Sequence, residues 1–145
     1  MATTQSGFRL AHLSDLHIGP MPRITPGTLI GKRALGYLSW RLRKQRVHRP
    51  EVLTALRQDL LASAPDHIAI TGDLVNLALP AEFERAALWL QDLGPPERIS
   101  VVPGNHEAYA AVRPAESLVH WAEYMSSDEG ARPAPHVAFP FLRRR

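Results

Sequence analysis

Three short turns of this 145-residue chain carry side chains suited to binding a metal ion. The first turn holds Asp15 and His17, the second holds Asp73, and the third holds Asn105 followed by His106. The chain contains no cysteine, so a metal ion would have to be held by imidazole nitrogens and by oxygen atoms. Each of the three turns directly follows a short apolar run, so the same arrangement recurs three times.

The chemistry that these residue types support is metal-assisted hydrolysis. Asp15 and His17 alternate on an extended segment, so both side chains could reach one ion if the turn bends. Asp73 has two carboxylate oxygens and could bridge two cations, while Asn105 offers a neutral amide oxygen. Two cations about 4 Å apart can share a bridging hydroxide and clamp a phosphoryl group. His106 stands beside Asn105, where an imidazole could protonate a leaving oxygen.

The elements that must position these turns can be read from apolar patterns. Residues 8–13, 67–70 and 99–102 are typical of buried strands. Residues 51–63 and 82–93 show the spacing of amphipathic helices, the first with Val52, Leu53, Leu56, Leu60 and Leu61 on one face. Alternation of strand and helix predicts parallel pairing with right-handed crossovers. All three turns then meet at the carboxyl edge of one sheet, where open α/β sheets bind ligands.

The remaining segments are less regular. Residues 19–28 are rich in proline and glycine, a composition that predicts a loop. A helix is expected over residues 29–44, with Leu35, Leu38 and Leu42 as its apolar stripe, and another over 115–125. From residue 126 to residue 145 the prolines oppose regular structure.

The three turns resemble, in order and in context, the first three signature blocks of the calcineurin-like metallophosphoesterases. The resemblance spans residues 8–109, and its blocks are Asp15-Leu16-His17, Gly72-Asp73-Leu74-Val75 and Gly104-Asn105-His106-Glu107. It implies an α/β sandwich around a binuclear centre of Mn, Fe or Zn type that hydrolyses phosphoester substrates. It also implies roles: Asp15 and His17 hold the first metal, Asp73 bridges, Asn105 holds the second metal, and His106 is the catalytic histidine.

Later blocks of that family, a histidine after a further strand and a Gly-His-x-His turn, are missing. After His106 the chain has only His120 and His136, and neither follows a strand pattern. The second metal would then have only Asp73 and Asn105, whereas catalytic sites usually supply three or more protein ligands. We therefore expect residues 1–145 to form a single incomplete, truncated metallophosphoesterase domain, a partial α/β sandwich with parallel βαβ units.

Two alternatives to an active phosphoesterase follow from that ligand count. One is a catalytically incompetent fragment that acts at most as a binding module. The other is a site completed by a second chain, since a truncated domain would leave an apolar face open. The sequence leaves the oligomeric state and the natural substrate open.

Basic residues are concentrated between Lys32 and Arg49, although the net charge of the chain is only +3. This stretch fits a solvated helix face, a cap that attracts phosphate, or contact with an anionic membrane surface, since Tyr37 and Trp40 interleave with its cations. No nucleic-acid-binding module is recognisable. We find no signal peptide and no apolar run of about 20 residues, so we expect a cytoplasmic protein, peripheral to a membrane at most.

Other notable side chains have structural interpretations. His12 falls at an expected core position of a strand, and His67 opens another. Glu107 is expected to support neighbouring site residues or to be solvated rather than to bind a metal itself, and Tyr37 and Trp40 are expected to be packing residues.

Overall fold

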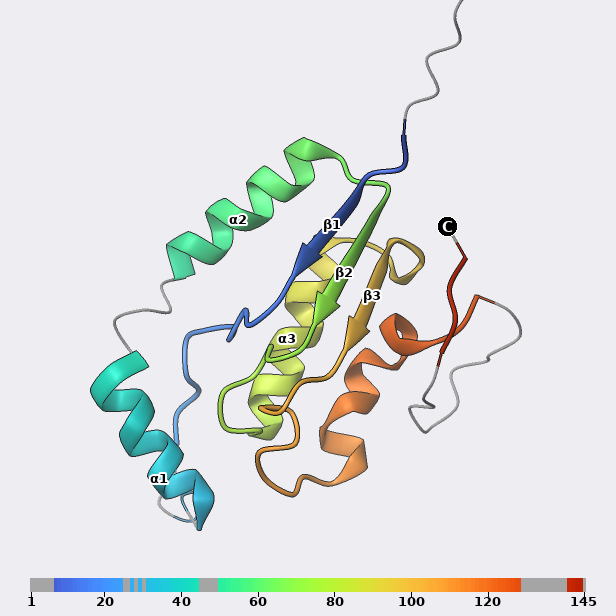
Figure 1. Ribbon diagram of the computed structural model, residues 1–145. Coiled ribbons are helices and arrows are strands. Elements are labelled where there is room, and N and C mark those ends of the chain that lie inside the picture. Colours follow the sequence, from blue (N-terminus) through green and yellow to red (C-terminus); the bar gives the residue numbers. More distant parts are fainter. Residues whose placement is uncertain are drawn as a thin grey trace, which may run out of the picture.

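The computed structural model describes residues 7–24, 27, 29, 31–44, 50–128 and 141–144. Three strands, β1 (Leu10–Leu13), β2 (His67–Thr71) and β3 (Ile99–Val102), form a parallel sheet in the order β1-β2-β3 (Figure 1). These are the three apolar runs predicted as strands, so the predicted mixed α/β fold with parallel pairing is confirmed. All three strands run in one direction, and their carboxyl ends share one edge of the sheet.

Helices fill the connections between the strands. Helix α2 (Pro50–Ser63) precedes β2, and α3 (Pro80–Leu93) with the short helix η3 (Pro96–Arg98) precedes β3. The predicted helix over 29–44 is α1 (Lys32–Ser39), which continues as the π-helix η2 (Trp40–Lys44). The predicted helix over 115–125 consists of two 3₁₀ helices, η4 (Pro114–Glu116) and η5 (Leu118–Met125). None of the helices within the described ranges is long and apolar enough to cross a lipid bilayer.

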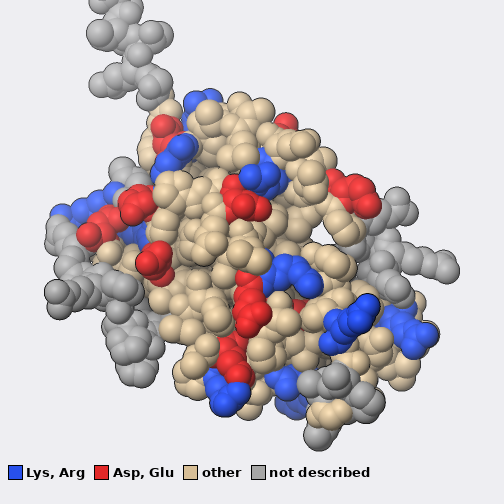
Figure 2. All heavy atoms as spheres, turned by 180° about the vertical axis from the view of Figure 1, so that it is seen from behind, with Lys and Arg blue, Asp and Glu red and all other residues tan. Residues whose placement is uncertain are grey.

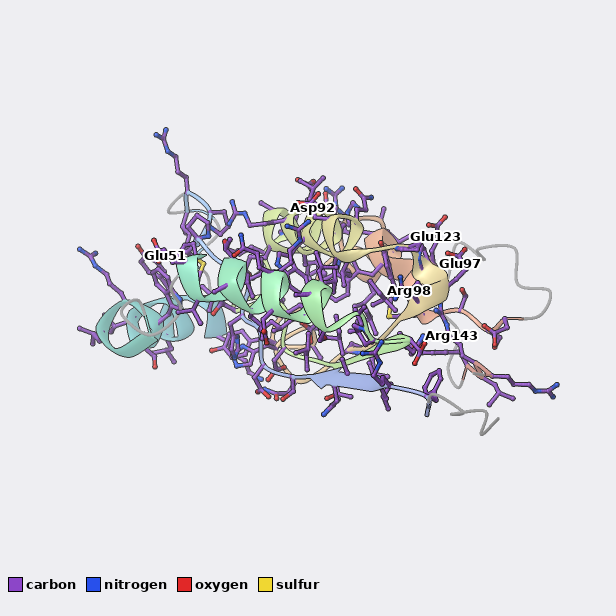
Figure 3. The ribbon with its side chains drawn as sticks, turned by 90° about the horizontal axis from the view of Figure 1, so that it is seen from above. Glu51, Asp92, Glu97, Arg98, Glu123 and Arg143 are labelled. Carbon is purple, nitrogen blue, oxygen red and sulfur yellow. The ribbon has the colours of Figure 1, made fainter. Side chains whose placement is uncertain are left out.

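One face of the sheet is packed against the helices. The register places Ile68, Ile70, Ile99 and Val101 on this face, and all four are buried. Seen from above, α2 and α3 lie on the same side of β1 (Figure 3). Burial of these side chains supplies the main driving force for folding.

The centre of the core is aromatic. Phe83 of α3 and Trp121 of η5 are fully buried, with ring centroids 5.3 Å apart. The indole Nε1 of Trp121 donates a hydrogen bond of 3.0 Å to the carbonyl of Phe83, which satisfies the one polar atom of this ring. This contact holds η5 against α3.

The opposite face of the sheet is more exposed than the sequence predicted. The prediction of a buried first strand is wrong in part, because Leu10 is 59% exposed and His12 is also exposed. Within the described residues β1 pairs with β2 alone, and its alternate side chains point away from the helices. His12 lies 2.8 Å from the hydroxyl of Thr71, whereas His67 is buried and lies 2.8 Å from the Ser100 hydroxyl.

The apolar faces of the first two helices also differ from the prediction. On α2, Leu60 is buried but Val52 and Leu61 are 60% and 45% exposed. The stripe of Leu35, Leu38 and Leu42 on α1 and η2 faces solvent, since all three side chains are more than half exposed. Periodicity identified the stripe, but the opposite side of α1 is the one that packs against the protein.

The C-terminal segment is joined to the body through Arg143. Its guanidinium donates hydrogen bonds of 2.7 Å to the carbonyl of Ile99 and 2.6 Å to that of Glu123 (Figure 3). Of the segment predicted to be irregular, residues 126–128 and 141–144 contain no helix or strand. The rest of it, with His136, lies outside the described residues, as do residues 45–49 of the basic stretch.

Candidate metal centre

The first two turns are joined by backbone hydrogen bonds beyond the ends of β1 and β2. The amide of Asp15 donates to the carbonyl of Gly72 at 3.2 Å, and that of His17 donates to the carbonyl of Asp73 at 2.8 Å. A third bond of 2.7 Å joins the amide of Ile18 to the carbonyl of Leu74. The chain therefore keeps its parallel alignment past the strands, and the two turns lie side by side.

The second and third turns approach so closely that only glycine fits between them. A Cβ atom on Gly72 would lie 2.5 Å from the Cα of Gly104, and a Cβ on Gly104 would lie 2.3 Å from Oδ1 of Asp73. The amide of His106 donates a 2.9 Å hydrogen bond to that same Oδ1. Backbone contact between the turns thus orients the Asp73 carboxylate.

The backbone at the candidate ligands is strained. Asp15, His17 and Asp73 have φ angles of 56°, 42° and 56°, in the left-handed region that residues other than glycine seldom adopt. Each such residue costs about 1–3 kcal/mol and persists only where its surroundings hold it. These are three of the five described non-glycine residues with positive φ, the others being Ala64 and Ala78, and such strain often occurs at functional sites.

His17, Asp73 and His106 form a cluster in which one ligand atom of each lies within 4.8 Å of the others. His17 and Asp73 are buried, and His106 is partly buried. The two imidazole rings meet edge to face, with centroids 4.7 Å apart. Residues that are distant in the sequence, on all three turns, are therefore brought together at the carboxyl edge of the sheet.

Backbone carbonyls orient both imidazoles. Nδ1 of His17 lies 3.1 Å from the carbonyl of Val75, and Nδ1 of His106 lies 2.6 Å from that of Asn76. A carbonyl only accepts, so in each ring Nδ1 must carry the proton, and Nε2 carries the lone pair. Metal-binding histidines are commonly oriented this way. Imidazole and carboxylate together suit a borderline divalent cation, so the residues present fit the metal that the sequence implied.

The other predicted ligands lie at the same edge of the sheet, but their side chains are more exposed to solvent. Asp15 and Asn105 are exposed, and among the described His, Asp and Glu side chains Asp15 is not part of the cluster. Asn105 lies between Gly104 and His106 in the third turn. The structure thus brings His17, Asp73 and His106 together, and the individual roles of all five residues stay predictions.

Glu107 ties the second and third turns together. Its buried carboxylate accepts hydrogen bonds from the amides of Asp73 (2.9 Å), Leu74 (2.7 Å), Val75 (3.1 Å) and Gly104 (2.7 Å). Of the two interpretations from the sequence, support of neighbouring site residues is therefore the correct one. Its position directly after Asn-His in the third turn was the signal for this role.

Sequence reasoning missed a second carboxylate of the same kind. Glu82, buried in the first turn of α3, accepts hydrogen bonds from the amides of Asn76 (3.0 Å), Leu77 (3.0 Å) and Leu79 (2.9 Å). Glu82 is the third residue of α3, two positions after Pro80, where glutamate often caps backbone amides. The sequence therefore did contain a signal for this role. Glu82 fixes the chain that follows Asp73.

The fold and the site define an α/β protein with a candidate metal centre at the carboxyl edge of a parallel sheet. A family model described as calcineurin-like phosphoesterase matches residues 8–138. The chain belongs to this family, which gives it a phosphoesterase-type function and implies divalent metal cofactors. No curated protein and no solved structure matches the chain significantly.

Proposed function

We propose that the chain hydrolyses phosphomonoesters or phosphodiesters at a binuclear metal centre. The cluster of His17, Asp73 and His106 at the sheet edge is the observation that carries this proposal. Asp15 and His17 would hold one ion, Asp73 would bridge, and Asn105 would hold the other. Bound divalent ions supply an activated water and neutralise the charge of the phosphoryl group.

His106 is the proposed catalytic residue. Its Nδ1 donates to the carbonyl of Asn76, which fixes the ring plane and directs Nε2 away from that carbonyl. When Nε2 is protonated, it can give its proton to the leaving oxygen as the bond between phosphorus and that oxygen breaks. The edge-to-face contact with His17 keeps this nitrogen beside the candidate ligands.

The proposal is tested by replacing His106 with asparagine. The amide of His106→Asn can still donate to the Asn76 carbonyl, but it has no group that transfers a proton. We expect kcat for Mn²⁺-dependent hydrolysis of bis(4-nitrophenyl) phosphate to fall by about 10²–10⁴-fold, while Mn²⁺ affinity measured by calorimetry stays unchanged.

The matched control is His120→Asn, which changes an exposed histidine on η5. It should retain both activity and metal affinity. If the wild-type chain hydrolyses the substrate with Mn²⁺ no faster than His106→Asn does, the proposed function is wrong. If His106→Asn loses Mn²⁺ as well, His106 is a metal ligand rather than the proton donor.

A second candidate function, a binding module for an anionic membrane surface, is favoured by the outer face of α1 and η2. Leu35, Leu38 and Leu42 are 72%, 54% and 73% exposed, and helical spacing puts the exposed Lys32 and Arg41 at the edges of this stripe. In the view from behind, basic side chains gather at the lower right, on the side where α1 lies (Figure 2). An apolar stripe bordered by cations is typical of helices that lie on anionic bilayers.

This candidate is tested by sedimentation with vesicles that contain phosphatidylserine. We expect the double variant Leu38→Ser/Leu42→Ser to lower partitioning by about tenfold or more, because two leucines no longer enter the bilayer. The control is Leu88→Ser, which changes a leucine of α3 that is 63% exposed. Equal sedimentation of both variants, or equal binding to neutral vesicles, would exclude this surface as the contact.

A further inference from the structure

A cavity of about 350 Å³ opens beside His106. One wall comes from α1 and η2, through Gly36, Ser39 and Trp40, with the largely exposed Leu35 at its edge. The other wall comes from the turns of the candidate metal centre, through Leu77, His106 and Tyr109. Its volume lies at the lower end of the range of small-molecule sites, which is about 300–1,000 Å³.

The helical wall is held in place by specific contacts. Arg33 donates hydrogen bonds to the carbonyls of Leu77 at 3.3 Å and Ala78 at 2.7 Å, and the Tyr109 hydroxyl donates to the carbonyl of Lys32 at 3.0 Å. These bonds join α1 directly to the segments that follow Asp73 and His106. The cavity therefore has walls that are fixed relative to the metal centre.

Gly36 allows this helix to come so close. A Cβ atom at this position would lie 2.6 Å from the hydroxyl oxygen of Tyr109 and 2.7 Å from a methyl carbon of Leu77. Glycine weakens a helix, so its presence inside α1 requires a compensating reason. The close packing of the helix against Tyr109 and Leu77 supplies that reason. Both contacted side chains line the cavity, which means that the space next to His106 depends on the absence of a side chain at Gly36.

Apart from His106, the described cavity walls carry no charged side chain, and they are rich in rings. Among its described lining residues there is no Lys, Arg, Asp or Glu, and the indole of Trp40 and the phenol of Tyr109 contribute flat surfaces. The ring of Tyr109 is nearly parallel to that of His106, with an angle of 12° and centroids 5.9 Å apart. Such walls favour an uncharged aromatic group.

A polar feature accompanies these rings. Asn76 lines the cavity with 4% of its surface exposed, and its Oδ1 is the one buried side-chain nitrogen or oxygen atom without a hydrogen-bond partner among the described residues. Buried acceptors of this kind are normally satisfied. A hydroxyl or N–H donor on a bound group would fit this requirement.

We propose that the cavity receives the leaving group of the phosphoester and selects an uncharged aromatic group that carries a hydrogen-bond donor. The proposal rests on the proposed function, in which the leaving oxygen lies at Nε2 of His106. Hydrolysis forms a bond from the water oxygen to phosphorus, breaks the bond to the leaving oxygen and releases one proton of the water to the solvent. The proton from His106 completes the released alcohol, whose ring occupies the space between Trp40 and Tyr109.

The first measurement compares phenylphosphonate with methylphosphonate, neither of which is hydrolysed, by calorimetry on the full chain with Mn²⁺. We expect the phenyl compound to bind about thirtyfold more tightly because its ring enters the cavity. Trp40→Ala should remove most of this preference without changing the affinity for methylphosphonate, and Trp40→Phe should retain it. If both phosphonates bind the wild-type chain and do so with equal affinity, the proposal is overturned.

A second measurement separates this proposal from the proposed function. Phenol, which has the ring and the leaving-group hydroxyl but no phosphorus, is titrated into the metal-free chain while the indole N–H resonance of Trp40 is followed, with Trp40→Phe used to assign it. A saturable shift that is absent on addition of methanol supports an aromatic site in the cavity even if neither phosphonate binds, an outcome that would count against the phosphoryl site at the metal centre and not against the cavity. No shift of the Trp40 resonance overturns the cavity assignment, whatever the metal centre does.

Discussion

Replacing Asp73 with asparagine is expected to abolish metal binding and hydrolysis together. The variant removes one negative charge from the cluster, yet its amide oxygen can still accept the hydrogen bond from the amide of His106. The turn should therefore keep its shape while the centre loses its anionic ligand. We expect kcat/KM for bis(4-nitrophenyl) phosphate to fall at least about 1,000-fold, or about 4 kcal/mol, with Mn²⁺ binding lost in calorimetry.

The matched control for this change is Asp59→Asn, which alters an exposed carboxylate on α2. Both variants should unfold at the same urea concentration as the wild-type chain to within about 1 kcal/mol of stability. If Asp73→Asn binds Mn²⁺ as tightly as Asp59→Asn does, then the cluster at the sheet edge is not the metal centre.

Replacing Glu107 with alanine is expected to have the largest effect on stability. Its carboxylate accepts four backbone hydrogen bonds, from Asp73, Leu74, Val75 and Gly104, and alanine would leave these amides without their acceptor. Each buried donor left unsatisfied costs about 1–3 kcal/mol, although the costs do not add fully. We expect the free energy of unfolding to fall by about 3–5 kcal/mol, measured in urea, with weaker Mn²⁺ binding.

Two further variants separate the hydrogen bonds from the charge of Glu107. Glu107→Gln keeps one acceptor oxygen in place, so its stability should lie between those of the wild type and the alanine variant. Glu84→Ala, at an exposed position of α3, should leave stability nearly unchanged. If Glu107→Ala and Glu84→Ala have the same stability, the four hydrogen bonds do not hold the turns together.

The strand and turn pattern was predictable because it depends on local sequence. A short apolar run followed by a turn with ligand-type residues identified β1, β2 and β3, and the order of elements predicted their parallel pairing. The meeting of His17, Asp73 and His106 followed from that topology alone, since the carboxyl ends of parallel strands share one edge.

The contacts around the site were not predictable, because they depend on which side of each element packs. The leucines of α1 suggested its apolar face, but the side with Gly36 and Trp40 is the one turned toward the centre. Arg33 and Tyr109 give no local signal that they join this helix to the turns. The exposed outward face of β1 was missed for the same reason, since a strand pattern does not reveal whether another layer covers that face.

The hydrogen bonds that join the turns also determine when the site can form during folding. His17 and Val75 are 58 positions apart, and Asp73 and Glu107 are 34 apart. Contacts of such long range require large loops to close first, which slows their formation relative to that of the helices. Because synthesis proceeds from the N-terminus, the second turn emerges before Glu107, and its amides lack their carboxylate acceptor until that residue follows. The candidate centre therefore takes shape after the helices and together with the sheet, whose strands pair over similar separations, Leu10 with His67 and Ile68 with Ile99.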